Sequence, residues 1–277
     1  MGRLRHIILA LPATLMMAAS GVPLAAGDGL VRLTDRDDLF GWEGVGRVDI
    51  KGGGYCTGVL IAPQLVLTAA HCVYDAQGRP RSPGSMQFRA GLADGQAIAE
   101  QTVGRVAAHK GFDPRKPFGA DAIRHDAALL ELSAPIPTSV ADPFALQKYA
   151  GRGQDVSVVS YGQGRDQALS WQRECAVLGR DQGLIAFDCN VTYGSSGAPV
   201  FVREGGRPRI LTLISGGRMQ GGPQLAFGMD LPPLLEQLKR DLRAMPKPAS
   251  SATGMRRVRV GEGGTASGAK FAKTPGS

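Results

Sequence analysis

Short apolar runs separated by turn-forming residues dominate the chain from about Gly41 onward. Glycine, proline, asparagine and aspartate lie between the runs, and each run has the length of a strand. Many short strands with frequent turn signals predict an all-β barrel or sandwich. The expected strands are residues 57–61, 65–69, 127–132, 156–161, 184–187, 199–202, 209–215 and 224–229.

These runs fall into two groups, which predict two β units. Residues 134–148 contain three prolines and no clear period, so we interpret them as the connection between the units. The first unit is then expected at 41–133 and the second at 149–230. Residues 28–40 would form an N-terminal arm ahead of the first unit.

One segment, 231–245, has the period of a helix. Its two prolines lie in the first turn, where they are tolerated. Leu234, Leu235, Leu238 and Leu242 form one apolar stripe, and basic residues gather toward the end. Residues 246–277 carry almost nothing that a core could bury, so we predict a disordered basic tail there.

The first 27 residues have the pattern of a secretory signal peptide. Arg3 and Arg5 precede an apolar or small run at 7–19, and small residues follow up to Gly27. The apolar run is too short for a transmembrane span. We therefore expect an exported protein, periplasmic or extracellular, with no membrane span after cleavage.

Four cysteines agree with an oxidising compartment. Four cysteines allow three pairings, and we favour the two local ones, Cys56 with Cys72 and Cys175 with Cys189. Each closes a loop of about 15 residues, worth roughly 3 kcal/mol. A zinc site is the alternative, but the sequence has no Cys-x-x-Cys motif.

The net charge of +8 does not lie on the predicted β units. The signal peptide carries two of the positive charges and residues 246–277 carry a net +5. Residues 28–245 are left with about +1, which excludes the basic footprint that nucleic-acid binding needs.

Candidate chemistry lies at three places. His71 ends an apolar strand in LTAAHC, where a Cys56–Cys72 bond would fix its backbone. Asp126 opens the apolar run DAALLEL and could orient a histidine; Asp121, in a loop, is the alternative. The third place is GSSGAP at 194–199, where either of two adjacent serines could be a nucleophile.

The order of these three motifs along the chain, and the residues around each, are informative. TGVLIAPQLVLTAAHC, HDAALLEL and GSSGAP, in that order, resemble the chymotrypsin-like serine peptidases, and most of all the secreted bacterial members that include glutamyl endopeptidases. The resemblance covers roughly residues 44–240. It implies two antiparallel β-barrels with a C-terminal helix, polypeptide substrates, and neither cofactor nor metal. We expect a monomer.

The resemblance also assigns roles. It makes Ser196 the nucleophile, His71 the base and Asp126 its orienting partner, with Ser195 at a position where the family has aspartate. The N–H groups of Gly194 and Ser196 would form the oxyanion hole. Ser215 would bond the buried aspartate, Gly216 and Gly217 would line the substrate strand, and Asn190 would lie at the base of the primary pocket.

Two rival functions were weighed. An α/β-hydrolase needs a histidine after its nucleophilic serine, and no histidine follows residue 125. An inactive homologue that serves as a binding module remains the alternative, although such proteins usually lack a triad member. Because Asn190 and Ile214 offer no charge to an Arg, Lys or Glu side chain, we expect cleavage after small or medium uncharged residues.

Overall fold

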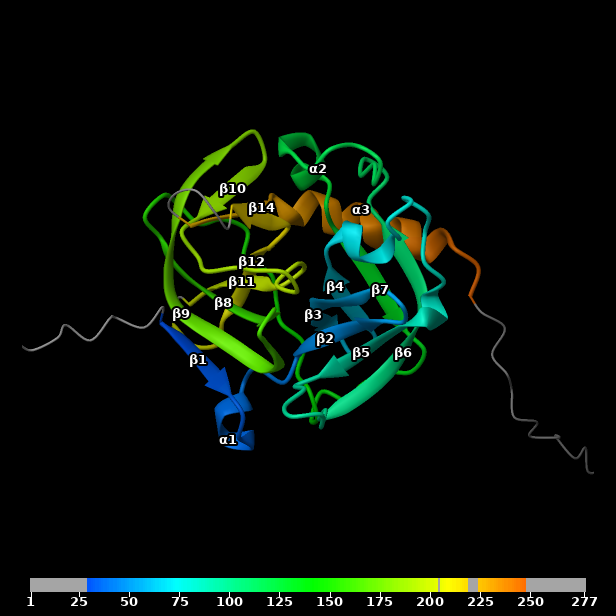
Figure 1. The fold of residues 1–277 in the computed structure, drawn as a ribbon, viewed down its shortest axis with the longest axis horizontal. Helices are drawn as coiled ribbons and strands as arrows, with labels where there is room; N and C mark the ends of the chain where they lie inside the picture. The colour runs from blue at the N-terminus through cyan, green and yellow to red at the C-terminus, as the bar shows by residue number, and fades with distance from the viewer. Residues whose placement is uncertain (1–28, 204, 219–223, 248–277) are drawn as a thin grey trace, which may run out of the picture. The chain divides into compact units, whose positions relative to one another are not determined.

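The computed structural model describes residues 29–203, 205–218 and 224–247 (Figure 1). The expected signal peptide at 1–27 and nearly all of the expected tail, from 248 on, lie outside these residues. No helix in the described ranges is both long and apolar enough to cross a bilayer.

The first β unit is a closed barrel of six antiparallel strands in the order β2-β3-β4-β7-β6-β5 (Figure 1). Apolar residues alternate with polar ones in β2 and β5, so that one face of each fills the barrel with Val48, Met86 and Phe88. The strands are β2 (Val45–Ile50), β3 (Gly54–Ala62), β4 (Leu65–Thr68), β5 (Met86–Ala90), β6 (Ala99–Ala108) and β7 (Ala128–Leu132).

Short helices lie in the loops of this barrel. The 3₁₀ helix η1 (Ala70–Val73) follows β4, and η2 (Pro83–Ser85) precedes β5. The short helix α2 (Ala120–Arg124) precedes β7. The loop with η1 thus follows β4 and the loop with α2 precedes β7, and these two strands are neighbours in the barrel.

The second β unit is a curved antiparallel sheet in the order β12-β11-β8-β9-β10-β14-β13. Backbone pairing in the described ranges does not close it, but Thr212 Oγ1 hydrogen bonds to both the amide and the carbonyl of Met229 and so joins β12 to β14. The strands are β8 (Asp155–Gly162), β9 (Arg165–Asp181), β10 (Leu184–Phe187), β11 (Pro199–Val202), β12 (Arg209–Leu213), β13 (Gly216–Arg218) and β14 (Leu225–Met229).

The N-terminal residues add a strand to this second sheet. Strand β1 (Leu30–Leu33) pairs antiparallel with β9, and the short helix α1 (Arg36–Leu39) leads from it toward β2. Leu33 and Leu39 are both buried. Trp42 then packs against Trp171, Phe201 and Phe144 with ring centroids 5.1–6.1 Å apart, which ties the entry to the first barrel to the second sheet.

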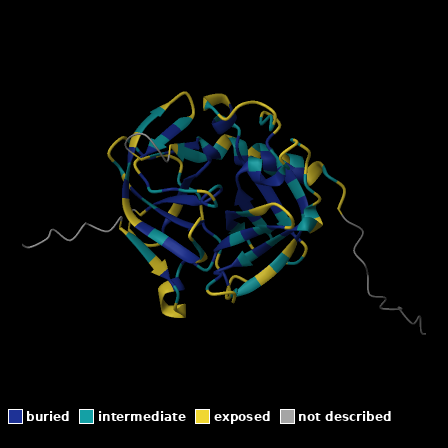
Figure 2. Cartoon of the chain, in the orientation of Figure 1, coloured by how far each residue is buried: buried dark blue, intermediate teal, exposed yellow. Residues whose placement is uncertain are grey.

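Helix α3 (Leu231–Ala244) follows the second sheet but packs on the first barrel. Three leucines of the predicted stripe, Leu235, Leu238 and Leu242, are buried together with Leu231, whereas the fourth, Leu234, is half-buried. Arg105 on β6 donates from Nη1 to the carbonyl of Leu242 at 3.0 Å. Buried residues fill the interior of both β units, and exposed ones lie on the loops and on the outer faces of strands and helices (Figure 2). The predicted all-β class with a C-terminal helix is confirmed.

Candidate active site

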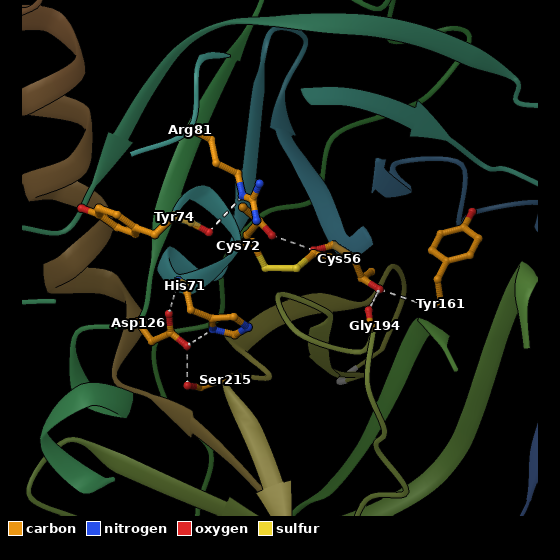
Figure 3. The surroundings of a disulfide bond; sticks show 11 residues. Cys56, His71, Cys72, Tyr74, Arg81, Asp126, Tyr161, Gly194 and Ser215 are labelled. Carbon is orange, nitrogen blue, oxygen red and sulfur yellow. Dashed lines mark hydrogen bonds and ion pairs between the residues drawn. A yellow bond between two sulfur atoms is a disulfide. The ribbon is translucent and has the colours of Figure 1, made fainter. Parts of the chain in front are cut away.

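His71 lies on η1, directly after the buried strand β4. Its neighbour Cys72 is bonded to Cys56 on β3, with Cα atoms 6.4 Å apart (Figure 3). The second disulfide joins Cys175 on β9 to Cys189, which follows β10. All four cysteine sulfurs are therefore bonded in pairs, and none offers the thiolate that a zinc site needs.

Asp126 holds His71 at two points. One carboxylate oxygen accepts the backbone N–H of His71 at 2.8 Å, and the other lies 2.7 Å from the ring atom Nδ1. Ser215 donates its hydroxyl to the second oxygen at 2.5 Å (Figure 3). The side chain of Asp126 is 1% exposed and that of His71 is 36% exposed, so the imidazole faces solvent while its partner does not.

Two opposing effects set the pKa of His71. Burial lowers the pKa, because the charged imidazolium loses hydration, whereas the charge of Asp126 and its hydrogen bond raise it. The net result is a pKa above the usual value. A hydrogen bond from Nδ1–H to Asp126 leaves Nε2 as the acceptor in the neutral ring. His71 thus has the properties of a general base with a fixed direction.

Thr57 holds the loop that carries the two adjacent serines. Its hydroxyl donates to the carbonyl of Gly194 at 2.8 Å, and its N–H donates to the carbonyl of Ser196 at 2.9 Å. The same hydroxyl accepts the N–H of Tyr161 at 3.0 Å (Figure 3). Because Thr57 lies on β3, the first barrel fixes a loop of the second sheet.

Gly197 permits this close approach. Its φ is +77°, and a Cβ atom there would lie 2.3 Å from Thr68 Oγ1 and 2.4 Å from the carbonyl of Thr57. Any side chain would therefore separate the serine loop from the first barrel.

The serine loop leaves two N–H groups unused. Ser195 N–H donates to Thr192 and Gly197 N–H donates to Ile214, but in the described part of the chain Gly194 and Ser196 donate to no acceptor. The Tyr193 carbonyl accepts the N–H of Gln163 at 2.7 Å, and the Ser195 carbonyl accepts that of Ala198 at 2.9 Å. In a trans peptide the N–H points opposite to the carbonyl, so these bonds fix the direction of both free N–H groups.

The two serines have different surroundings. Ser195 is fully buried; its hydroxyl lies 3.2 Å from that of Ser160 and accepts the N–H of Thr192 at 3.3 Å. Ser196 lines two clefts, and His71 lines both of them as well. Of the two, only Ser196 is open to a substrate.

The two clefts share His71, Tyr193 and Ser196 and differ in the rest of their lining. The β13 arm, about 540 Å³, is lined mostly by apolar side chains and by the backbone of β13. The disulfide arm, about 490 Å³, runs along the Cys56–Cys72 bond. Besides the shared residues, the β13 arm includes Phe112, Lys116, Phe118, Val191, Ile214, Gly216 and Gly217, and the disulfide arm includes Tyr55, Cys56, Cys72, Tyr74, Arg81 and Gln163.

The structure places the remaining candidates around the β13 arm. Ser215, Gly216 and Gly217 line it. Asn190 is next to the lining residue Val191 but does not itself line the arm; its N–H donates to Gln172 Oε1 at 2.6 Å. The carboxylate of Asp121 pairs with Lys116 and His125 and not with His71.

Two residues were missed by sequence reasoning. Thr57 and Gln163 donate hydrogen bonds to backbone carbonyls of the serine loop, so neither is part of a sequence motif for catalytic side chains. Thr57 follows Cys56 directly, and that adjacency is the one signal in the sequence that could have drawn attention to it.

Known proteins resemble this chain in sequence. Residues 56–207 match the family described as Trypsin-like peptidase domain. The chain is 26% identical to a glutamyl endopeptidase of Bacillus licheniformis over 155 residues, which cover 56% of the chain and 47% of that protein. It is 31% identical to serine protease 23 of Homo sapiens over 232 residues, covering 71% of the chain and 57% of that protein. The chain spans about half the length of these curated relatives.

Solved structures share the fold. A Glu endopeptidase in complex with MPD superposes with a TM-score of 0.66 at 18% identity, covering 79% of the chain and 98% of that structure. The thermostable serine protease AL20 from an extremophilic microorganism gives a TM-score of 0.60 at 20% identity, covering 73% and 98%. At these identities the likeness concerns the fold alone.

Proposed function

Because the chain belongs to the Trypsin-like peptidase domain family, we propose that it is a serine endopeptidase whose triad is His71, Asp126 and Ser196. The observation that carries this proposal is the anchoring of His71. Asp126 binds both its backbone N–H and its ring Nδ1, and the imidazole then faces clefts that Ser196 also lines.

In this proposal Ser196 attacks the carbonyl carbon of the scissile peptide bond while His71 Nε2 takes the hydroxyl proton. Asp126 stabilises the resulting imidazolium and keeps the ring oriented. His71 then gives the proton to the leaving amine, which departs as the acyl-enzyme forms. Water, activated by the same imidazole, hydrolyses the ester and restores Ser196.

The N–H groups of Gly194 and Ser196 would receive the oxyanion. Both are free of acceptors in the described part of the chain, and their directions are fixed by neighbouring carbonyl bonds. Donors that are in position before the reaction need no reorganisation as charge develops. This supports an oxyanion hole that exists in the resting protein.

We propose that the acyl part of the substrate lies in the β13 arm and that its primary side chain is small or medium and uncharged. A Cβ atom at Gly217 would lie 2.7 Å from Val191 Cγ2, so the Val191 side chain reaches that wall and limits the depth of the pocket. Val191, Thr192 and Ile214 offer no charge there. We also propose that the protein acts outside the cytoplasm, since both disulfides need an oxidising compartment.

The test is cleavage of a denatured protein mixture, with the cleaved bonds mapped by mass spectrometry. Wild type should cleave mainly after small or medium uncharged residues. Ser196→Ala should abolish cleavage and Ser195→Ala should retain most of it. Activity in Ser196→Ala together with its loss in Ser195→Ala would overturn the assignment, and a strong preference for Arg or Lys would overturn the pocket argument.

A further inference from the structure

We propose that the disulfide arm binds the part of the substrate that follows the cleaved bond, and that Arg81 there selects an acidic side chain. The inference rests on the proposed peptidase function and adds a preference on the leaving-group side. Arg81 lies in the loop between η1 and η2, and no residue of the proposed triad comes from that loop.

The direction of the substrate follows from the two arms. Strand β13 pairs only with β14 in the described ranges and is an edge of its sheet, so an extended peptide can add to it in the β13 arm. A peptide whose acyl part lies there must continue past Ser196 and His71 on the other side. The disulfide arm begins at those same residues and therefore receives the leaving segment.

Arg81 is positioned by its own neighbours. Its Nε donates to the carbonyl of Tyr74 at 2.9 Å (Figure 3). Its backbone N–H donates to the carbonyl of Val73 at 2.9 Å. The guanidinium lies against Gly53, where a Cβ atom would be 2.6 Å from both terminal nitrogens. The side chain is half-buried, and the bond from Nε and the contact with Gly53 restrict its position.

The two terminal nitrogens of Arg81 have no hydrogen bond or ion pair within the described residues. Among the described residues that line the disulfide arm, Arg81 and His71 are the ionisable cations and there is no carboxylate. A guanidinium with both terminal N–H₂ groups available matches the two oxygens of a carboxylate. Tyr55 and Tyr74 also line the arm.

The β13 arm is a weaker site for an acidic side chain. Its lysine, Lys116, is 61% exposed and lies 3.7 Å from Asp121, which already neutralises part of its charge. Exposed pairs of this kind contribute little. The acidic preference is therefore assigned to the side of the cleaved bond that faces Arg81.

The experiment uses one peptide series with a constant segment before the cleaved bond. The second and third residues after the bond are both Glu, both Gln or both Lys. Wild type should cleave the Glu peptide with a kcat/KM about fivefold to tenfold above that of the Gln peptide, and the Lys peptide should be the poorest. The preference should shrink as salt is raised.

Variants locate the effect. Arg81→Gln should cleave the Glu and Gln peptides with equal kcat/KM, and Arg81→Lys should keep only part of the Glu preference. Arg81→Glu should instead favour the Lys peptide. Arg79→Gln is the matched control, because Arg79 is 73% exposed, pairs with Asp75 and does not line the arm. That control should keep the wild-type ratio.

Each other outcome has a defined meaning. Equal rates for the three peptides would overturn the acidic preference while leaving the peptidase proposal intact. A Glu preference that persists in Arg81→Gln would overturn the role of Arg81. No cleavage of any peptide by folded wild type would instead contradict the proposed function. If Arg81→Gln does not fold, the ratio measured in Arg81→Lys decides.

Discussion

At His71, burial and one carboxylate act in opposite directions on the same proton, and the carboxylate prevails. The consequence is a base whose pKa lies above the usual value of about 6.5. In the proposed mechanism His71 must be neutral to accept the proton of Ser196, so activity should rise with pH through this raised pKa. The imidazole is thus oriented and made more basic by the same residue.

Asp126→Asn should change both properties. The amide removes the charge that raises the pKa of His71, so the midpoint of the pH–rate profile should move to lower pH. Turnover should fall by about 10⁴, because the amide favours the wrong tautomer of the ring. The measurement is kcat/KM from pH 5 to 9. Asp121→Asn is the control and should be mild; an unchanged midpoint in Asp126→Asn would contradict the account.

The choice between the two serines shows what sequence alone could reach at this scale. GSSGAP offers two hydroxyls with the same local chemistry, and only the resemblance favoured Ser196. The structure supplies the physical distinction, since Ser195 is buried against Ser160. Thr57 could not be identified from the sequence, because its role is to bind the carbonyls of Gly194 and Ser196, which lie 137 and 139 positions away.

Among the elements, the strands predicted from the sequence are those with few polar residues. Strand β11 is buried along its whole length and β7 at all but one position, and such strands appear as continuous apolar runs. The strands β2, β5, β6 and β9 were missed because each carries polar residues on an exposed face, and the short strands β1 and β13 were missed as well. Arg47, Arg89 and Glu100 make ion pairs across those faces and interrupt the apolar pattern.

Helix α3 depends on a second histidine for part of its docking. His109 is buried, its Nδ1 accepts the N–H of Gly111 at 3.2 Å, and Nε2 therefore donates to Gln237 Oε1 at 3.1 Å. Burial and the nearby His125, stacked at 5.2 Å, lower the pKa of His109. The hydrogen bond to Gln237 and the charge of Asp241 raise it, but the net result is a lowered pKa. Protonation of His109 at Nδ1 would set an N–H group against the N–H of Gly111 and break that hydrogen bond.

Acid should weaken this contact. A histidine whose pKa is lower in the folded state than in the unfolded state stabilises the fold above its unfolded pKa and loses that contribution as pH falls. The free energy of unfolding should therefore drop more between pH 7 and pH 5 in wild type than in His109→Gln, which cannot titrate. Urea unfolding at each pH measures this; equal slopes for the two proteins would show that His109 does not contribute.

At the scale of the molecule, the N-terminal residues belong to the second sheet. Strand β1 occupies the edge of β9, and Ser195 makes only neutral hydrogen bonds. In trypsin-like zymogens the aspartate before the nucleophile pairs with an N-terminal ammonium that proteolysis frees, whereas Ser195 has no charge for such a pair. The oxyanion hole should form without such an ion pair.

Two chains test this, one that begins at Asp28 and one that begins at Gly41. The longer chain should be active as made. The shorter chain should be less stable by about 3 kcal/mol or more, because it loses the buried side chains of Leu33 and Leu39. Activity assays and thermal unfolding report on the two effects separately. A longer chain that is inactive until trimmed would indicate control of another kind.

The central claim is that Ser196 is an activated nucleophile in the folded protein, and covalent labelling tests it most directly. A phosphonylating reagent for active serines is incubated with wild type, Ser196→Ala and Ser195→Ala, and the modified peptide is identified by mass spectrometry. The account predicts stoichiometric labelling at Ser196 in wild type and Ser195→Ala, and none in Ser196→Ala. Folded wild type that takes up no label, as a non-catalytic binding module would, contradicts it.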